Sequence, residues 1–134
     1  MGKKEINGLS QSILESYSSQ LLEVSKNIDE DILKAAELII NNSGKVVISG
    51  LGKSGLIGQK IVATLCSTGT RSVYMHAAEA IHGDLGIYNP GDPTILISKS
   101  GNTEELVKLI PILKEFKSPL IAIVGTVESF IATN

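Results

Sequence analysis

The chain has 134 residues, 43% of them hydrophobic and 19% charged, and its 12 basic and 14 acidic side chains give a net charge of -2, which suits one globular domain with its own core. Tryptophan is absent and no lysine- or arginine-rich block occurs, so a nucleic-acid partner is not expected. The single cysteine, the lack of a secretory signal in MGKKEINGLS and the shortness of the apolar runs predict a cytoplasmic protein that does not enter the membrane.

Residues 1–44 are predicted to form two amphipathic helices. The first has apolar residues that step by three and four and therefore share one stripe, namely Ile13, Leu14, Tyr17, Leu21, Val24 and Ile28. Asp29 has the residue type of an N-cap, and the apolar pattern of the second helix stops at Asn41-Asn42-Ser43-Gly44.

Residues 45–134 alternate short apolar runs with helix-length intervals. The runs lie at 46–49, 73–75, 95–97 and 120–124, and continuous Val, Ile and Leu of this length are typical of parallel strands buried on both faces. We expect an α/β fold: a three-layer α/β/α sandwich with a central parallel sheet, preceded by the two helices. The final ESFIATN begins a helix and stops, which predicts a C-terminally incomplete domain or one that depends on a partner.

In such sheets ligands bind beyond the carboxyl ends of the strands, so the loops there are the candidate sites. The first such loop, SGLGKSGLIGQK, contains Gly50, Gly52 and Gly55 in the dinucleotide-binding pattern, but Met75-His76 stands where that pattern needs an acid. It offers free amides, the Lys53 ammonium and the Ser54 hydroxyl at a helix start, which suit an anion or a sugar hydroxyl. The alternative is a tight turn with a solvated lysine.

The second candidate loop, SKSGNTEEL, places Ser98, Ser100 and Thr103 around Gly101 and ahead of a helical pattern. Hydroxyls and free amides at a helix start can hold a phosphate, and the helix dipole favours negative charge there. Ordinary helix capping is the alternative, but it requires only one of the three hydroxyls.

The third candidate segment, HAAEAIHGDLG, holds both histidines of the chain, His76 and His82. A helix here would put Glu79 and His82 on one face and would end at Gly83-Asp84. A metal site that used Cys66 as well has no matching zinc spacing. A structural histidine is the common alternative, but an imidazole near the strand ends can move a proton at neutral pH.

Together, GLGKSG, STGT at 67–70, HAAEAIHGDLG and SKSGNTEE resemble the sugar isomerase (SIS) domain, and within it the arabinose-5-phosphate isomerase branch. The resemblance implies interconversion of D-arabinose 5-phosphate and D-ribulose 5-phosphate through a cis-enediol, without a cofactor or a metal. It also implies a homotetramer that feeds Kdo synthesis for lipopolysaccharide or capsule. Carried over motif by motif, it implies two sets of site residues: Lys53, His82 and Glu105 for catalysis, and Gly52, Ser54, Ser98, Ser100, Gly101 and Thr103 for substrate and phosphate binding.

The chain also departs from this family. Family members continue with a further strand, an acidic residue and a catalytic histidine, and most then carry cystathionine-β-synthase-type repeats, whereas this sequence has no histidine after His82. Lys99 stands where asparagine is common and would add affinity for an anion. A non-catalytic sugar-phosphate-binding module is therefore the second hypothesis, and a nicotinamide-dependent oxidoreductase, based on the glycine pattern alone, is the third.

Overall fold

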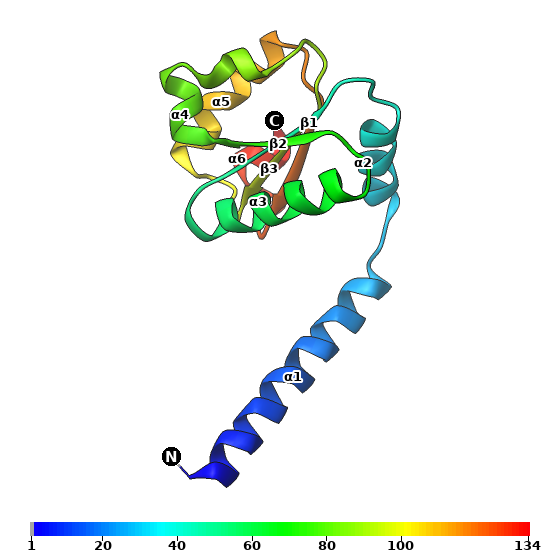
Figure 1. The fold of residues 1–134 in the computed structure, drawn as a ribbon, viewed down its shortest axis with the longest axis vertical. Helices are drawn as coiled ribbons and strands as arrows, with labels where there is room; N and C mark the ends of the chain where they lie inside the picture. The colour runs from blue at the N-terminus through cyan, green and yellow to red at the C-terminus, as the bar shows by residue number, and fades with distance from the viewer. Residues whose placement is uncertain (1) are drawn as a thin grey trace. The chain divides into compact units, whose positions relative to one another are not determined.

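The computed structural model describes residues 2–134 and divides into two compact units, Met1–Lys34 and Ala35–Asn134. The first unit contains helix α1 (Lys3–Lys26) and the first turn of helix α2 (Glu30–Ile40). The second unit contains the rest of α2 and every strand of the described chain, and it is the mixed helix and sheet part of Figure 1.

Helix α1 has defined ends. The Gly2 N–H donates to Oε2 of Glu5 at 2.7 Å, and the Asn27 side-chain amide donates to the Glu23 carbonyl at 2.9 Å. Asp29 caps the N-terminus of the next helix, α2, as predicted: its Oδ1 accepts the N–H of Asp31 at 3.0 Å. Ile28 lies beyond the end of α1, so its assignment to the helical stripe was wrong, because the chain leaves the helix at Asn27.

A four-stranded parallel sheet forms the middle of the second unit. Its strands are β1 (Val46–Gly50), β2 (Ser72–His76), β3 (Thr94–Ser98) and β4 (Leu120–Val124), in the order β2-β1-β3-β4. Each strand covers the apolar run predicted for it. The chain goes from β1 to the edge strand β2 and then crosses back to β3 on the other side of β1.

Helices cover both faces of the sheet. After α2, the helical elements are α3 (Gly52–Ser67), α4 (Ala77–His82), the 3₁₀ turn η1 (Asp84–Ile87), α5 (Glu104–Glu115) and α6 (Phe130–Thr133). Residues of α2 and α3 pack on one side of the sheet, where Ile39 and Ile61 meet the buried Ile48. Residues of α4, α5 and α6 pack on the other side (Figure 1). The three-layer α/β fold is confirmed.

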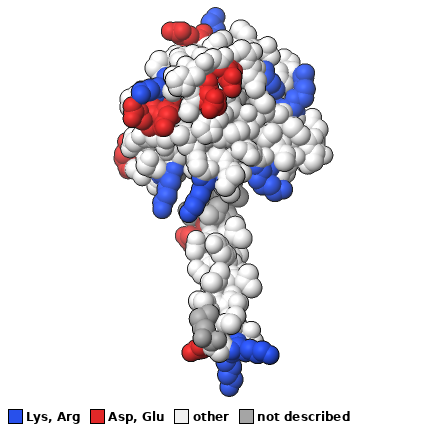
Figure 2. All heavy atoms as spheres, turned by 60° about the vertical axis from the view of Figure 1, so that its left-hand side comes forward, with Lys and Arg blue, Asp and Glu red and all other residues white. Residues whose placement is uncertain are grey.

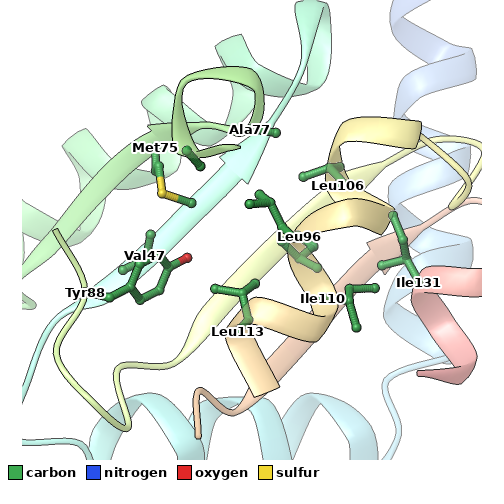
Figure 3. Packing of buried hydrophobic residues seen from close by; sticks show 11 residues of the cluster. Val47, Met75, Ala77, Tyr88, Leu96, Leu106, Ile110, Leu113 and Ile131 are labelled. Atoms are coloured by element: carbon green, nitrogen blue, oxygen red, sulfur yellow. The ribbon is translucent and has the colours of Figure 1, made fainter. Parts of the chain in front are cut away.

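The larger core lies between the sheet and α5. Figure 3 shows Val47 and Leu96 of the two central strands on the face of the sheet that α5 covers, where Leu113 of α5 joins the same cluster. Met75 and Tyr88 lie at one end of this cluster. Every residue of β1 and β3 is buried, which explains why residues 46–48 and 95–97 are apolar at consecutive positions rather than at alternating ones. This rigid centre fixes where the loops after β1 and β3 begin.

Strand β4 at the sheet edge is only half-buried, and its Ile123 is 48% exposed. Across residues 2–134, no helix combines the length and the hydropathy that crossing a membrane requires.

Candidate functional site

The strand order places the topological switch point of the sheet between β1 and β3. Connections from these two neighbouring strands leave in opposite directions, because α3 follows β1 on one face of the sheet and α5 follows β3 on the other. Ligands of open α/β sheets bind at such a switch point, beyond the carboxyl ends of the strands. Gly50 pairs with Ile97 across it, so the glycine-rich loop and the serine-rich loop start side by side.

The glycine-rich loop turns directly into α3. Gly52 is the first residue of the helix and has φ +53°, a backbone conformation that favours glycine. Lys53 and Ser54 therefore lie in the first turn of a 16-residue helix, where backbone N–H groups have no intrahelical partner. Lys53 is exposed, and no ion pair to it is found within residues 2–134. These groups can attract and bind an anion.

Tyr74 of β2 holds this loop in place, a role that sequence reasoning missed. Its hydroxyl donates to the Gly50 carbonyl at 2.6 Å, and burial raises the pKa of this phenol, so it remains protonated and a donor. A Cβ on Gly55 would lie only 2.5 Å from the same oxygen. A side chain at position 55 would crowd the Tyr74 hydroxyl and the Gly50 carbonyl, and this close packing accounts for the glycine.

The serine-rich loop is organised by its own hydroxyls. Ser98 is buried, and its Oγ accepts the Gly101 N–H at 3.0 Å and lies 2.8 Å from Oγ1 of Thr103. Ser100 is exposed, and its Oγ accepts the Asn102 N–H at 3.2 Å. Thr103 is the N-cap residue of α5, but its side chain bonds to Ser98 instead of capping the helix. Simple capping therefore does not explain the three hydroxyls.

The segment after β4 holds the serine-rich loop in place through hydrogen bonds. The Gly125 N–H donates to the Lys99 carbonyl at 3.0 Å, and the Ile131 N–H donates to the Gly101 carbonyl at 3.0 Å. Oδ1 of Asn102 accepts the Phe130 N–H at 3.0 Å. Gly101 has φ +66°, and a Cβ there would collide with the side chain of Ser129. The loop is thus held in one conformation before any ligand arrives.

The histidine-containing segment forms a short helix, as predicted. α4 starts at Ala77, directly after His76 ends β2, and it ends at His82 because Gly83 takes φ +139°. Ala77 and Ala80 face the core, which leaves Glu79 and His82 exposed on the outer side. His82 therefore lies one helix length beyond the strand end that neighbours Gly50.

A cavity of about 380 Å³ lies at the carboxyl end of β2. Its lining includes His76 and Asp84 together with Tyr74, Gly83 and Ile87, but not Lys53, His82 or Glu105. The sequence analysis assigned no role to His76. The stretch HAAEAIHGDLG, which holds both histidines, is the sequence feature that coincides with this cavity. No three His, Cys, Asp or Glu side chains within residues 2–134 gather in a way that could hold a metal ion.

The structure therefore brings most of the predicted site residues to one edge of the sheet. Lys53 and Ser54 lie in the first turn of α3, Glu105 lies in the first turn of α5, and His82 is the last residue of α4. Within residues 2–134, no hydrogen bond or ion pair joins Lys53, His82 and Glu105 to one another. The strand order places Lys53 and Glu105 after the neighbouring strands β1 and β3, whereas His82 lies at the far end of α4 from β2.

The opposite edge of the sheet carries a partly buried ion pair. Nζ of Lys45 lies 2.6 Å from Oδ2 of Asp92, whose carboxylate also accepts the N–H groups of Lys45 and Asn89. Burial alone would raise the pKa of Asp92, but these hydrogen bonds outweigh burial and lower it. The pair ties the start of β1 to the loop before β3 and is structural.

The SIS domain model matches residues 39–134, and the chain belongs to this family. Among curated proteins, it is 47% identical over 130 residues to "Arabinose 5-phosphate isomerase KpsF" of Escherichia coli O6:H1 strain CFT073. It is 45% identical over 124 residues to "Probable arabinose 5-phosphate isomerase" of Haemophilus influenzae. These alignments cover 96% and 92% of this chain but only 39% and 37% of the relatives, so the chain spans about two fifths of their length.

Among solved structures, c3406 of E. coli CFT073, determined in complex with arabinose 5-phosphate, superposes with a TM-score of 0.92 at 34% identity. The match covers 99% of this chain and 71% of that one. A phosphoheptose isomerase from Francisella tularensis, 22% identical with a TM-score of 0.69, shares the fold. The resemblance deduced from GLGKSG, HAAEAIHGDLG and SKSGNTEE is confirmed.

Proposed function

We propose that this chain forms the sugar-phosphate site of an aldose-ketose isomerase that interconverts D-arabinose 5-phosphate and D-ribulose 5-phosphate. One observation carries the proposal: two preformed loops, both opening helices with free amide groups, flank the β1/β3 switch point. The arabinose 5-phosphate bound to the solved relative and the names of the curated relatives support the choice of substrate.

In this proposal the phosphate binds the serine-rich loop. The exposed Ser100 hydroxyl and the amides between Ser98 and Thr103 contact the phosphate, while the buried Ser98 hydroxyl maintains the shape of the loop. Lys99 adds a positive charge beside it. The loop does not need to reorganise, because Gly125 and Ile131 already hold its carbonyls.

Isomerisation then requires only proton movement. After ring opening, a base removes the proton from C2 of the aldose, and the resulting cis-enediolate takes a proton at C1 to give the ketose, so no electrons leave the substrate. Glu105 has the chemistry of the base, Lys53 that of a cation beside the enediolate, and His82 that of a shuttle between oxygens or a helper in ring opening. Gly52 and Ser54 contact the substrate on the side where Lys53 lies.

The setting of this reaction is also a proposal. Following the family resemblance of the sequence, we propose that the product is used for Kdo in lipopolysaccharide or capsule, and that the enzyme acts in the cytoplasm as a homotetramer. The alternative function is a module that binds the sugar phosphate without converting it.

Two variants separate these functions. His82→Ala should abolish turnover while changing the dissociation constant for arabinose 5-phosphate by less than about tenfold, because a proton-transfer group acts mainly in the transition state. Ser100→Ala should weaken binding by about tenfold or more, the usual effect of losing a hydrogen bond to a charged group. Isomerase assays and titration calorimetry on the same samples measure both quantities.

Binding without turnover in the unmodified chain would establish the sensing module instead. Equal loss of binding in the two variants would contradict the separation between phosphate-binding and catalytic residues.

A further inference from the structure

Asn102 in the serine-rich loop makes hydrogen bonds on both sides, and the proposed function assigns it no role. Its backbone N–H donates to the Ser100 hydroxyl oxygen at 3.2 Å, and its side-chain Nδ2 donates to the Ser100 carbonyl at 3.3 Å. Its other side-chain atom, Oδ1, accepts the N–H of Phe130, which lies 28 positions further along the chain. Asn102 therefore joins Ser100 to the segment after β4.

The contact with Phe130 takes the place of a local cap on helix α6. Phe130 is the first residue of α6, and Ser129 before it has the residue type of a normal N-cap. The Ser129 side chain makes no capping hydrogen bond, and within residues 2–134 its buried hydroxyl has no partner. The side chain of Asn102 satisfies one of the free N–H groups of the first turn of α6 instead. The serine-rich loop thus supplies the cap that α6 does not make for itself.

The contacts with Ser100 restrict the direction of its hydroxyl. A serine hydroxyl has one proton to donate and two lone pairs that accept. The Asn102 N–H occupies one lone pair of the Ser100 oxygen, so the proton stays available for a phosphate oxygen. Ser100 is exposed, and within residues 2–134 no other hydrogen bond reaches its hydroxyl. Asn102 is therefore the residue that sets how this hydroxyl is presented.

Directed hydrogen bonds matter here because the chain does not attract anions by its overall charge. The net charge is -2, and Figure 2 shows acidic and basic side chains mixed on the face of the second unit that it draws. A hydrogen bond to a charged group is stronger than a neutral one, but it requires a donor in the correct direction.

We propose that the side chain of Asn102 is a positioning residue for phosphate binding. It holds Ser100 in the orientation that donates to the phosphate, and it anchors this orientation to the start of α6. The inference rests on the phosphate contact of Ser100 in the proposed function, but it does not depend on turnover. Asn102 acts through Ser100 and not on the sugar.

A double-mutant cycle, measured by titration calorimetry with inorganic phosphate and with arabinose 5-phosphate, tests this role. Asn102→Ala removes both side-chain hydrogen bonds and should weaken both ligands by about fivefold, whereas Ser100→Ala should weaken them by about tenfold. Because Asn102 acts through Ser100, the double variant should bind no more weakly than Ser100→Ala. Independent effects would multiply to about fiftyfold.

Asn27→Ala is the matched control. The Asn27 side chain also donates to a backbone carbonyl, that of Glu23 at 2.9 Å, but it lies at the end of α1 in the first unit. This variant should leave both dissociation constants unchanged. Circular dichroism shows whether each variant keeps its fold.

Hydrogen exchange tests the anchor in the absence of any ligand. Asn102→Ala should speed exchange of the Phe130 N–H by about fivefold, whereas Asn102→Asp keeps an acceptor oxygen for that N–H and should leave its exchange slow. Asn102→Asp should still weaken phosphate binding, because it loses the donor to the Ser100 carbonyl and places a carboxylate beside the anion.

Multiplied losses in the double variant, or a loss for arabinose 5-phosphate without a loss for phosphate, would overturn the role of Asn102 and leave the proposed function intact. Unchanged Phe130 exchange in Asn102→Ala would overturn the anchor. The expected cycle in a chain that shows no turnover would support the role of Asn102 and contradict only the isomerase. An unmodified chain that binds neither ligand would overturn both proposals.

Discussion

Substitution of Gly101 by alanine tests the claim that the serine-rich loop is preformed. Gly101 has φ +66°, and an alanine side chain there would meet the side chain of Ser129, which is 3% exposed and cannot move into solvent without disturbing its surroundings. The left-handed backbone costs an alanine about 1–2 kcal/mol, and overpacking adds about 1–3 kcal/mol. We expect Gly101→Ala to lower the free energy of unfolding by about 3 kcal/mol.

Gly52→Ala is the matched control in the other loop. Gly52 has a similar φ of +53°, but no atom lies within 4 Å of a Cβ built there. Only the backbone cost of about 1–2 kcal/mol applies. Urea unfolding of both variants measures the difference, and titration with arabinose 5-phosphate should show the larger loss of affinity for Gly101→Ala.

The double variant Gly101→Ala, Ser129→Gly removes the collision and should recover the overpacking part of the loss. Equal destabilisation by Gly52→Ala and Gly101→Ala would refute the argument, because it would mean that the segment after β4 does not press against the loop.

The remaining predictions concern the two ends of the sheet. Asp92→Asn should lower the free energy of unfolding by about 3 kcal/mol in urea titrations, because it leaves the Lys45 ammonium without its buried partner. Since the pKa of Asp92 is lowered in the fold, its stabilising contribution is complete above the unfolded-state pKa and should fade below about pH 4; a flat stability profile there would argue against the pair. Tyr74→Phe should cost about 1 kcal/mol and weaken arabinose 5-phosphate binding a few-fold, and unaltered binding would exclude Tyr74 as support for the glycine loop.

The fold was largely predictable because its signals are local. The continuous apolar runs of β1 and β3 reflect burial on both faces, and the polar stop at Asn41-Asn42-Ser43-Gly44 ends α2. The end of α1 was misplaced because Ile28 continues the apolar period, whereas the side chain of Asn27 bonds back to Glu23 and lets the chain leave the helix.

The sequence predicted which loops form the candidate site, but it did not predict the contacts between their residues. SKSGNTEE shows three hydroxyls around a glycine, and the structure adds that Ser98 and Thr103 bond to each other. The support given by Tyr74 to Gly50 comes from a residue 24 positions away, and no periodicity in the sequence encodes it. The strand order, which decides that the loops after β1 and β3 are neighbours, likewise arises only from tertiary packing.

Amide chemical shifts recorded by NMR during a titration with arabinose 5-phosphate would show where the sugar phosphate binds. We expect the largest changes on residues 52–55 and 99–103, at the carboxyl edge of β1 and β3. Changes confined to the opposite edge around Lys45 and Asp92, or no change at millimolar ligand, would contradict it.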